Sequence, residues 1–268
     1  MLKGLLRRTS KFVILCSVVL LFGGSLSAAS LPFPIGEELT YSISWNGIPV
    51  ARVIATTEMD VLEGREVLAL RMRTKTAAFF NKIFKVDDLH ESLIDLETFL
   101  PIQYTKNLKE GRYRCHEITT FDFVEKKAHY EHQVNGRKKE YDIEEETRDV
   151  LSFMYFMRSE SLKENQKPRY RMMADEKLYD LILHTYSIEK IRLPAYNDKI
   201  PSLKMYPEAM FDGLFVRKGK ATLWVSRDSR RLLTFAKIKV PFGRARVKLK
   251  SVKGPGDDFW ITEREDDE

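Results

Sequence analysis

Histidines are the first residues to test for metal chemistry in this 268-residue sequence, which contains five of them. His129 and His132 are the closest pair. Residues three positions apart on a strand point to opposite faces of a sheet, so this spacing does not suit joint coordination of one ion. We therefore predict no metal site and no cofactor, and we interpret the histidines as structural or exposed.

A cluster of acids is the next candidate for chemistry. Asp87 and Asp88 stand beside His90 and Glu91, and such a group could supply an acid and a base. Adjacent side chains on a strand diverge, however, which separates the two aspartates. We interpret the cluster as capping groups or as ion-pair partners of arginines.

Cys115 is the one cysteine beyond the first 30 residues. It alternates with Tyr113, which predicts that the thiol faces the core, where free cysteine is common. Its neighbour His116 points to the other face and is no partner for it. The sequence also lacks a Gly-x-Ser-x-Gly elbow and a Gly-rich loop before a helix. We predict that the protein is not an enzyme. An enzyme that acts on glycans or lipids of the cell envelope is kept as an alternative, after the two functions given at the end of this section.

Two rows of cations have strand spacing. Arg244, Arg246, Lys248 and Lys250 form one row, and Arg71 and Arg73, continued by Lys75, form the other. Such rows could bind anionic lipid headgroups at a membrane surface, or an envelope protein partner. They could equally form the solvated face of a sheet, paired with acids on neighbouring strands. The second interpretation is the expectation, because charge is the ordinary state of an outward face.

Aromatic residues suggest an apolar ligand. A shell of strands can leave a cavity that takes a lipid or a lipoprotein acyl chain. The aromatic residues that could line it are Trp45, Phe79, Phe80, Phe84, Phe153, Tyr155, Phe156 and Trp224. The alternative is that a central helix fills the interior completely.

Residues 1–29 have the pattern of a secretory signal peptide. Lys3, Arg7, Arg8 and Lys11 form a basic region, an apolar run follows, and cleavage is expected after Ala29. The bulky residue before Cys16 argues against lipid attachment. We predict export to the periplasm without lipidation. Without this leader and its four cations, the net charge falls from +6 to +2, so nucleic acid is not an expected partner.

The elements that must position these residues are strands around one helix. Within residues 147–159, the stretch from Val150 to Met157 would be apolar on nearly every side of a helix. This predicts a buried helix with Thr147 or Asp149 as its cap. On both sides the sequence alternates with period two, as at Leu39 to Trp45, and Asn46-Gly47 is a strong hairpin signal.

Three segments depart from this alternation. We interpret Ala77 to Phe84 as a connection folded back over the sheet, with a membrane-dipping or ligand-gating tip as the alternative. Leu193 to Met210 holds three prolines and is predicted to be an ordered excursion. The acidic tail, 254–268, is predicted to follow a single β-rich domain over residues 30–253, with disorder expected from Glu263.

Four segments of the sequence together carry a family resemblance. In chain order they are Gly36 to Tyr41, Lys85 to Asp95, Asp149 to Arg158 and Ala221 to Leu232. They resemble one family of exported bacterial proteins, the domain-of-unknown-function family 3108. The similarity extends from about Phe33 to Val252. It implies an envelope protein with a curved antiparallel sheet, and it supplies no catalytic residue.

Together these features predict a mainly β fold: a strongly curved antiparallel sheet, or half-open barrel, wrapped around one buried helix. The predicted function is non-enzymatic binding of an apolar or lipid-like molecule between sheet and helix. The alternative is a structural protein of the envelope that holds a protein partner through a sheet edge or a basic face.

Overall fold

The computed structural model describes residues 33–255, except 195, 197, 212–213, 218–220 and 241–242. Contacts divide the chain into two units, Met1–Ser30 and Leu31–Glu268, and the description below concerns the second. The expected leader and the tail beyond residue 255 lie outside the described residues. The described residues contain no helix long and apolar enough to cross a membrane.

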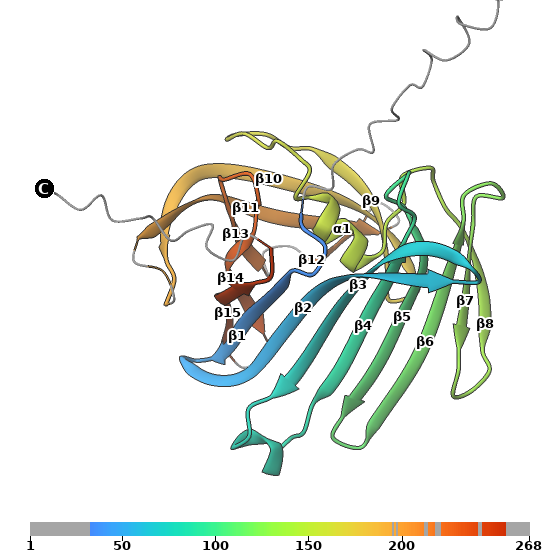
Figure 1. Cartoon of the computed structure of the whole chain (residues 1–268), viewed down its shortest axis with the longest axis horizontal. Helices are drawn as coiled ribbons and strands as arrows, with labels where there is room; N and C mark the ends of the chain where they lie inside the picture. The colour runs from blue at the N-terminus through green and yellow to red at the C-terminus, as the bar shows by residue number, and fades with distance from the viewer. Residues whose placement is uncertain are drawn as a thin grey trace, which may run out of the picture. The chain divides into compact units, whose positions relative to one another are not determined.

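Strands dominate the described chain. They are β1 (Glu38–Trp45), β2 (Ile48–Leu62), β3 (Arg65–Thr76), β4 (Asp87–Ile94), β5 (Pro101–Glu110), β6 (Tyr113–Asp122), β7 (Lys127–His132), β8 (Lys138–Asp142), β9 (Arg169–Ala174), β10 (Lys177–Arg192), β11 (Lys199–Phe211), β12 (Leu214–Arg217), β13 (Ala221–Ser226), β14 (Leu233–Val240) and β15 (Gly243–Lys253). All belong to one antiparallel sheet in the order β8-β7-β6-β5-β4-β3-β2-β1-β15-β14-β13-β11-β10-β9, and β12 pairs with β11. The sheet curves around the single α-helix of the described residues, α1 (Val150–Phe156), which confirms the predicted fold class (Figure 1).

Period-two alternation determines which side chains of each strand are buried. Leu39 and Tyr41 of β1 are buried while their neighbours are not, and they pair with Ala55 and Val53 of β2, which are also buried. The turn between these strands has the predicted Asn46-Gly47, both with positive φ, 48° and 93°. Two successive left-handed residues are what a tight hairpin of right-twisted strands requires.

Helix α1 is fixed at its start by Asp149. The Asp149 carboxylate accepts hydrogen bonds from the backbone N–H groups of Leu151 and Ser152, which confirms one of the two predicted caps. It also accepts one from the Ser92 hydroxyl of β4, 2.6 Å away, so the cap ties the helix to the sheet. Leu151, Phe153 and Tyr155 are buried, as the apolar sequence predicts.

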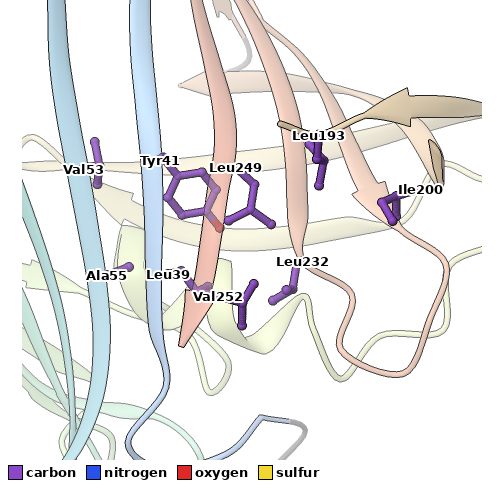
Figure 2. Packing of buried hydrophobic residues seen from close by; sticks show 9 residues of the cluster. All are labelled: Leu39, Tyr41, Val53, Ala55, Leu193, Ile200, Leu232, Leu249 and Val252. Carbon is purple, nitrogen blue, oxygen red and sulfur yellow. The ribbon is translucent and has the colours of Figure 1, made fainter. Parts of the chain in front are cut away.

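The largest cluster of buried apolar residues lies on the inner side of the sheet (Figure 2). Its members are Leu39, Tyr41, Val53, Ala55, Leu193, Ile200, Leu232, Leu249 and Val252. Burial of each such side chain contributes about 1.5–3 kcal/mol. The cluster joins β1, β2 and β15 at the middle of the sheet to the connections around Leu193 and Leu232.

Two sequence-based predictions were wrong. Most of the predicted ordered excursion, Leu193 to Met210, is strand: residues 199–211 form β11, although they include Pro201 and Pro207. Both prolines lie outside Ser202–Met205, the stretch of β11 that pairs with β13 as well as with β10, so their missing N–H groups face no second strand. Residues 77–84 do not fold back over the sheet either: Phe79 is 76% exposed and Ile83 73%.

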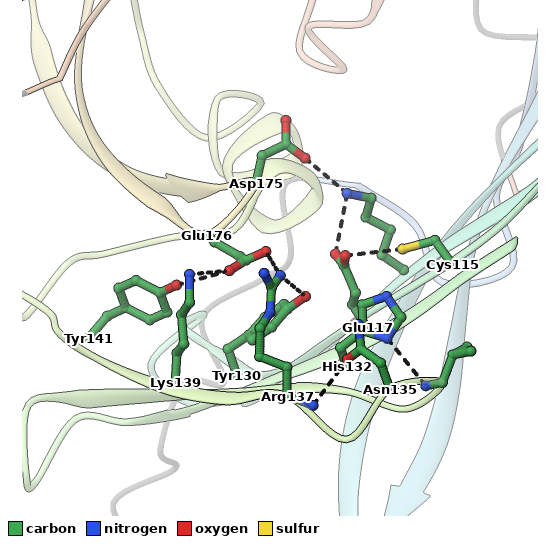
Figure 3. Close-up of polar contacts among 12 residues, drawn as sticks. Cys115, Glu117, Tyr130, His132, Asn135, Arg137, Lys139, Tyr141, Asp175 and Glu176 are labelled. Atoms are coloured by element: carbon green, nitrogen blue, oxygen red, sulfur yellow. Dashed lines mark hydrogen bonds and ion pairs between the residues drawn. The ribbon is translucent and has the colours of Figure 1, made fainter. Parts of the chain in front are cut away.

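The two ends of the open sheet meet through side chains (Figure 3). Glu176, in the turn between β9 and β10, forms ion pairs with Arg137 and with Lys139, the latter at 2.8 Å. Asp175 of the same turn accepts a hydrogen bond of 2.9 Å from Lys106 of β5. The seam between β8 and β9 is therefore closed by charged side chains, and no backbone ladder joins these strands in the described residues.

Candidate functional site: an apolar cavity between helix and sheet

A cavity of about 400 Å³ lies between α1 and the inner face of the sheet. One wall consists of alternate residues of neighbouring strands. From β1 and β2 these are Leu39, Tyr41, Ile43, Val53 and Ala55, and from β13 to β15 they are Leu223, Val225, Leu233, Ala236, Ile238 and Val247. Because inward residues alternate with outward ones along each strand, this wall is apolar apart from the hydroxyl of Tyr41.

The helix supplies the facing wall. Phe153, Met154 and Tyr155 line the cavity, and Met157 and Arg158 continue the wall just beyond the last turn. Methionine is flexible and adapts its shape to what it contacts. The helix therefore does not fill the interior, which answers the alternative left open by the sequence.

A buried ionic cluster adjoins the helix end of the cavity. The Glu37 carboxylate forms ion pairs with Arg158 and with Arg230, and all three side chains are at least nine-tenths buried. Arg158 also donates through Nε to the Arg230 carbonyl, 2.9 Å away. Arg231 lines the cavity and donates to the Arg158 carbonyl, 2.8 Å away. These bonds fix the end of α1 against the connection between β13 and β14.

Two tyrosines stand beside this cluster. Burial is the largest cause that raises the pKa of Tyr41 and of Tyr155, so both phenols stay neutral at physiological pH. The buried Tyr155 hydroxyl has no hydrogen-bond partner among the described residues. A buried polar atom of this kind is uncommon in folded proteins.

The structure brings only part of the predicted aromatic set to the cavity. Phe153 and Tyr155 line it. Phe156 instead packs edge-on against Tyr170, with the Arg148 guanidinium 4.1 Å from its ring centre. Trp224 lies on the outer face, where its Nε1 donates to Glu189 over 2.8 Å.

The remaining predicted aromatics lie at one end of the sheet, away from the cavity walls. Trp45 ends β1 and is exposed. Phe79, Phe80 and Phe84 belong to the connection between β3 and β4, which includes the 3₁₀-helix η1 (Phe80–Lys82). These three phenylalanines lie outside the strands. The alternation that assigns a strand side chain to one face of the sheet therefore could not place them.

The two cationic rows have different surroundings. Arg71 is held by Glu58, Asp60 and Glu91, and Arg73 pairs with Asp87 over 2.8 Å. That row is the solvated, paired face that was expected. Arg244, Arg246, Lys248 and Lys250 have no carboxylate within 4.0 Å among the described residues. Burial and the neighbouring cations lower the pKa of the Lys248 ammonium.

One cluster was missed by sequence reasoning. The Cys115 thiol, which is buried as predicted, lies near Glu117 and His132, with ligand atoms within 4.8 Å of one another. Lys106 stands 3.3 Å from the Glu117 carboxylate and competes with any cation there. His132 accepts the Val134 N–H at Nδ1, whereas a ligating histidine ordinarily donates from its second nitrogen. The cluster forms because β6 and β7 pair in register, a contact that single-strand spacing does not reveal.

Fold and cavity together define a class: a half-open antiparallel β-barrel with a helix inside its curve. The sequence profile of DUF3108, described as a protein of unknown function, matches residues 40–250, and the chain belongs to this family. The predicted resemblance to this family is thus confirmed.

A solved structure supports the same fold. The chain is similar to a β-barrel-like protein of the domain-of-unknown-function family DUF1849 from Brucella abortus, with a TM-score of 0.54. The match covers 82% of this chain and 97% of that one at 7% sequence identity, which is evidence of a shared fold alone. No curated protein matches the chain.

Proposed function

We propose that this protein binds an apolar or lipid-like molecule, such as a lipid or a lipoprotein acyl chain, between α1 and the sheet. The observation that carries the proposal is the cavity of about 400 Å³. Its size falls in the range of about 300–1,000 Å³ that small-molecule sites have. Its walls are apolar apart from Thr74, the hydroxyl groups of the two tyrosines, Arg158 and Arg231.

Packing energetics support an occupant. Protein interiors are close-packed, and side chains that border an empty space lose their dispersion contacts on that side. The walls here combine two methionines of the α1 segment, Met154 and Met157, with partly exposed Ile43, Leu233 and Val247. An apolar guest restores those contacts and removes this surface from water.

The proposal places this binding in the cell envelope, after export by the leader at residues 1–29, and it assigns the protein no catalytic step. Both parts rest on the sequence. A leader of this type directs a chain across the inner membrane, and a water-filled periplasm is where an apolar guest needs a protein to shield it.

Uptake of a fluorescent fatty acid by delipidated protein tests the proposal. We expect saturable binding with increased emission. Ala236→Phe places a ring in the cavity and should abolish uptake, since Ala236 is buried and faces the cavity. Val124→Phe adds the same side chain at a residue that is 94% exposed, and it should bind like the parent. No uptake by the parent, or equal uptake by Ala236→Phe, would reject the cavity as the site.

A second candidate function is supported by the uncompensated row on β15. Cations that lack acidic partners on their own protein favour an acidic partner protein in the envelope. Cross-linking in intact cells from Arg246 should capture one defined protein, and Lys248→Glu should prevent this capture. The sheet edges are less suited to this role, because Arg148 bridges to Met172 of β9, and Lys139 of β8 pairs with Glu176 in the turn that follows β9.

A further inference from the structure

Three connections and the start of one strand meet at one end of the sheet. The connections are residues 45–50 between β1 and β2, 77–86 between β3 and β4 and 109–114 between β5 and β6, and the strand start is residues 243–244 of β15. We call them together the rim. The Gly111 N–H donates to the Lys85 carbonyl over 2.7 Å, and Ala77 donates to Val50 over 2.8 Å. Asn46 donates to the Arg244 carbonyl over 3.0 Å. These contacts make the rim one continuous surface, from which the connection between β3 and β4 projects (Figure 1).

The rim exposes large apolar side chains. Trp45, Ile48, Phe79, Ile83, Phe84 and Tyr113 are all exposed. Phe84 lies against the backbone of the next turn, since a Cβ at Gly111 would be 2.9 Å from its ring. Exposed apolar side chains gathered in this way mark interaction sites, whereas scattered single ones need no explanation.

The rim is also strongly cationic. It carries Lys82, Lys85, Lys109, Arg112, Arg114 and Arg244, and its one acid is Glu110. Within the described part of the chain, none of these six cations has a carboxylate within 4.0 Å. Their charge is therefore available to an anionic partner.

The opposite end of strands β2 to β8 has the reverse character. Its connections, residues 63–64, 95–100, 123–126 and 143–149, hold eight acids and two cations. The large apolar side chains exposed at that end, Ile35, Val61 and Val124, are aliphatic. The charge and the exposed aromatics thus distinguish one end of the sheet from the other.

We propose that the rim docks on an anionic lipid bilayer surface, with Phe79 and Ile83 inserted among the headgroups. Aromatic side chains prefer the interface between water and hydrocarbon, and lysine and arginine beside them are attracted to anionic lipids. A protein partner fits this composition less well, because protein interfaces are depleted in lysine. The inference concerns where the protein sits and stands independently of the cavity's occupant.

One end of the cavity lies near the rim. Ile43, Thr74, Ile238 and Val247 line the part of the cavity nearest the rim, since they stand a few residues from the turns at 46–47, 77–86 and 243–244 along their strands. A protein seated on its rim presents this end of the cavity to the lipid surface. An apolar guest would then have a short path between bilayer and cavity.

Sedimentation with vesicles tests the proposal on the full mature chain. The probes are vesicles of phosphatidylcholine with about a third phosphatidylglycerol, and vesicles of phosphatidylcholine alone. We expect binding to the anionic vesicles that weakens with added salt. Phe79→Ser/Ile83→Ser and Lys82→Glu/Lys85→Glu should each weaken binding by about tenfold or more.

Matched controls come from outside the rim. Val124→Ser removes an exposed apolar side chain, and Lys163→Glu/Lys167→Glu reverses two exposed lysines, so both should bind like the parent. Trp45 provides a second readout: its emission should shift to shorter wavelength on anionic vesicles, and Trp45→Phe should remove that shift. All seven positions changed in the rim and control variants are exposed, so folding should be preserved.

Three outcomes would overturn the proposal. They are failure of the parent to bind anionic vesicles, equal losses in the rim and control variants, and cross-linking from position 83 in cells that captures one protein and no lipid. Fatty-acid uptake is measured separately without vesicles, so a failure of docking leaves the cavity proposal standing, and the reverse also holds.

Discussion

Arg158, two residues beyond α1, donates two hydrogen bonds to the carboxylate of Glu37, which directly precedes β1. The Nη1–Oε2 distance is 2.6 Å and the Nη2–Oε1 distance is 3.1 Å. The two residues are 121 positions apart in the chain and both are buried. These two bonds fix the end of the helix against the start of the first strand, beside the cavity that Arg158 helps to line.

Removing the Glu37 charge should destabilise the protein strongly. In Glu37→Gln the buried guanidinium groups of Arg158 and Arg230 face each other without an anion, which costs about 3–5 kcal/mol. The free energy of unfolding in urea measures the effect. Glu145→Gln breaks an exposed pair with Lys126 and should cost at most about 1 kcal/mol. Similar losses in both variants would mean that the buried cluster does not hold the helix.

Stability should depend on pH through His90. Burial and then the Lys106 charge lower the pKa of His90, while Asp88 and Asp175 act in the opposite direction. The unfolded chain protonates this histidine near pH 6.5, so below that pH the unfolded state binds more protons until the lower folded-state pKa is reached. The free energy of unfolding therefore falls as the pH drops from about 6.5.

Comparison of the parent with His90→Gln isolates the pH dependence that is due to His90. The contribution of His90 is the difference between the parent and His90→Gln, and acids that titrate in both proteins cancel from it. We expect this difference in unfolding free energy to change between pH 7.5 and 5, by no more than about 1.4 kcal/mol per pH unit. If the unfolding free energy of His90→Gln varied with pH in parallel with that of the parent, the prediction would be contradicted.

Cys115 should react slowly in the folded protein. The thiol is buried, it donates to the Glu117 carboxylate over 3.0 Å, and burial raises its pKa. Since the thiolate is the reactive form, a thiol reagent should label Cys115 at a rate set by opening of the structure. Release of the chromophore from a disulfide reagent, with and without urea, measures this. Labelling of the native protein as fast as the unfolded one would show that the thiol is accessible.

The seam between β8 and β9 should open more easily without Glu176. Glu176→Gln removes the acid that pairs with Arg137 and Lys139, and the loss of global stability should stay within about 1 kcal/mol because these pairs are partly solvated. Amide hydrogen exchange in residues 138–142 and 169–177 should accelerate, while exchange in β1 to β3 should not. Unchanged exchange at the seam would mean that the apolar contacts alone close it.

Sequence reasoning succeeded where periodicity is local. Alternation at Leu39 to Trp45 and the Asn46-Gly47 turn predicted the hairpin, and the apolar run at 150–157 predicted the buried helix. It failed for β11, because two prolines argue against a strand until the neighbours of each strand are known. It also failed for residues 77–84, since aromatic composition favours burial and the exposure of Phe79 depends on where the connection projects.

The site was predictable only in part for the same reason. Phe153 and Tyr155 could be assigned to the interior from the helix pattern. The ion pair of Glu37 with Arg158 and the proximity of Cys115 to His132 depend on the packing of segments that lie apart in the sequence. The predicted row at Arg71 proved to be paired with acids of adjoining strands, whereas the row from Arg244 is not, and strand spacing alone does not distinguish them.

Native mass spectrometry of protein isolated gently from its own host tests the central claim most directly. The account predicts a bound apolar molecule that is absent from Ala236→Phe, where the added ring occupies the cavity, and present in Val124→Phe. A parent protein that carries nothing, and that takes up no fatty acid when offered one, would contradict it.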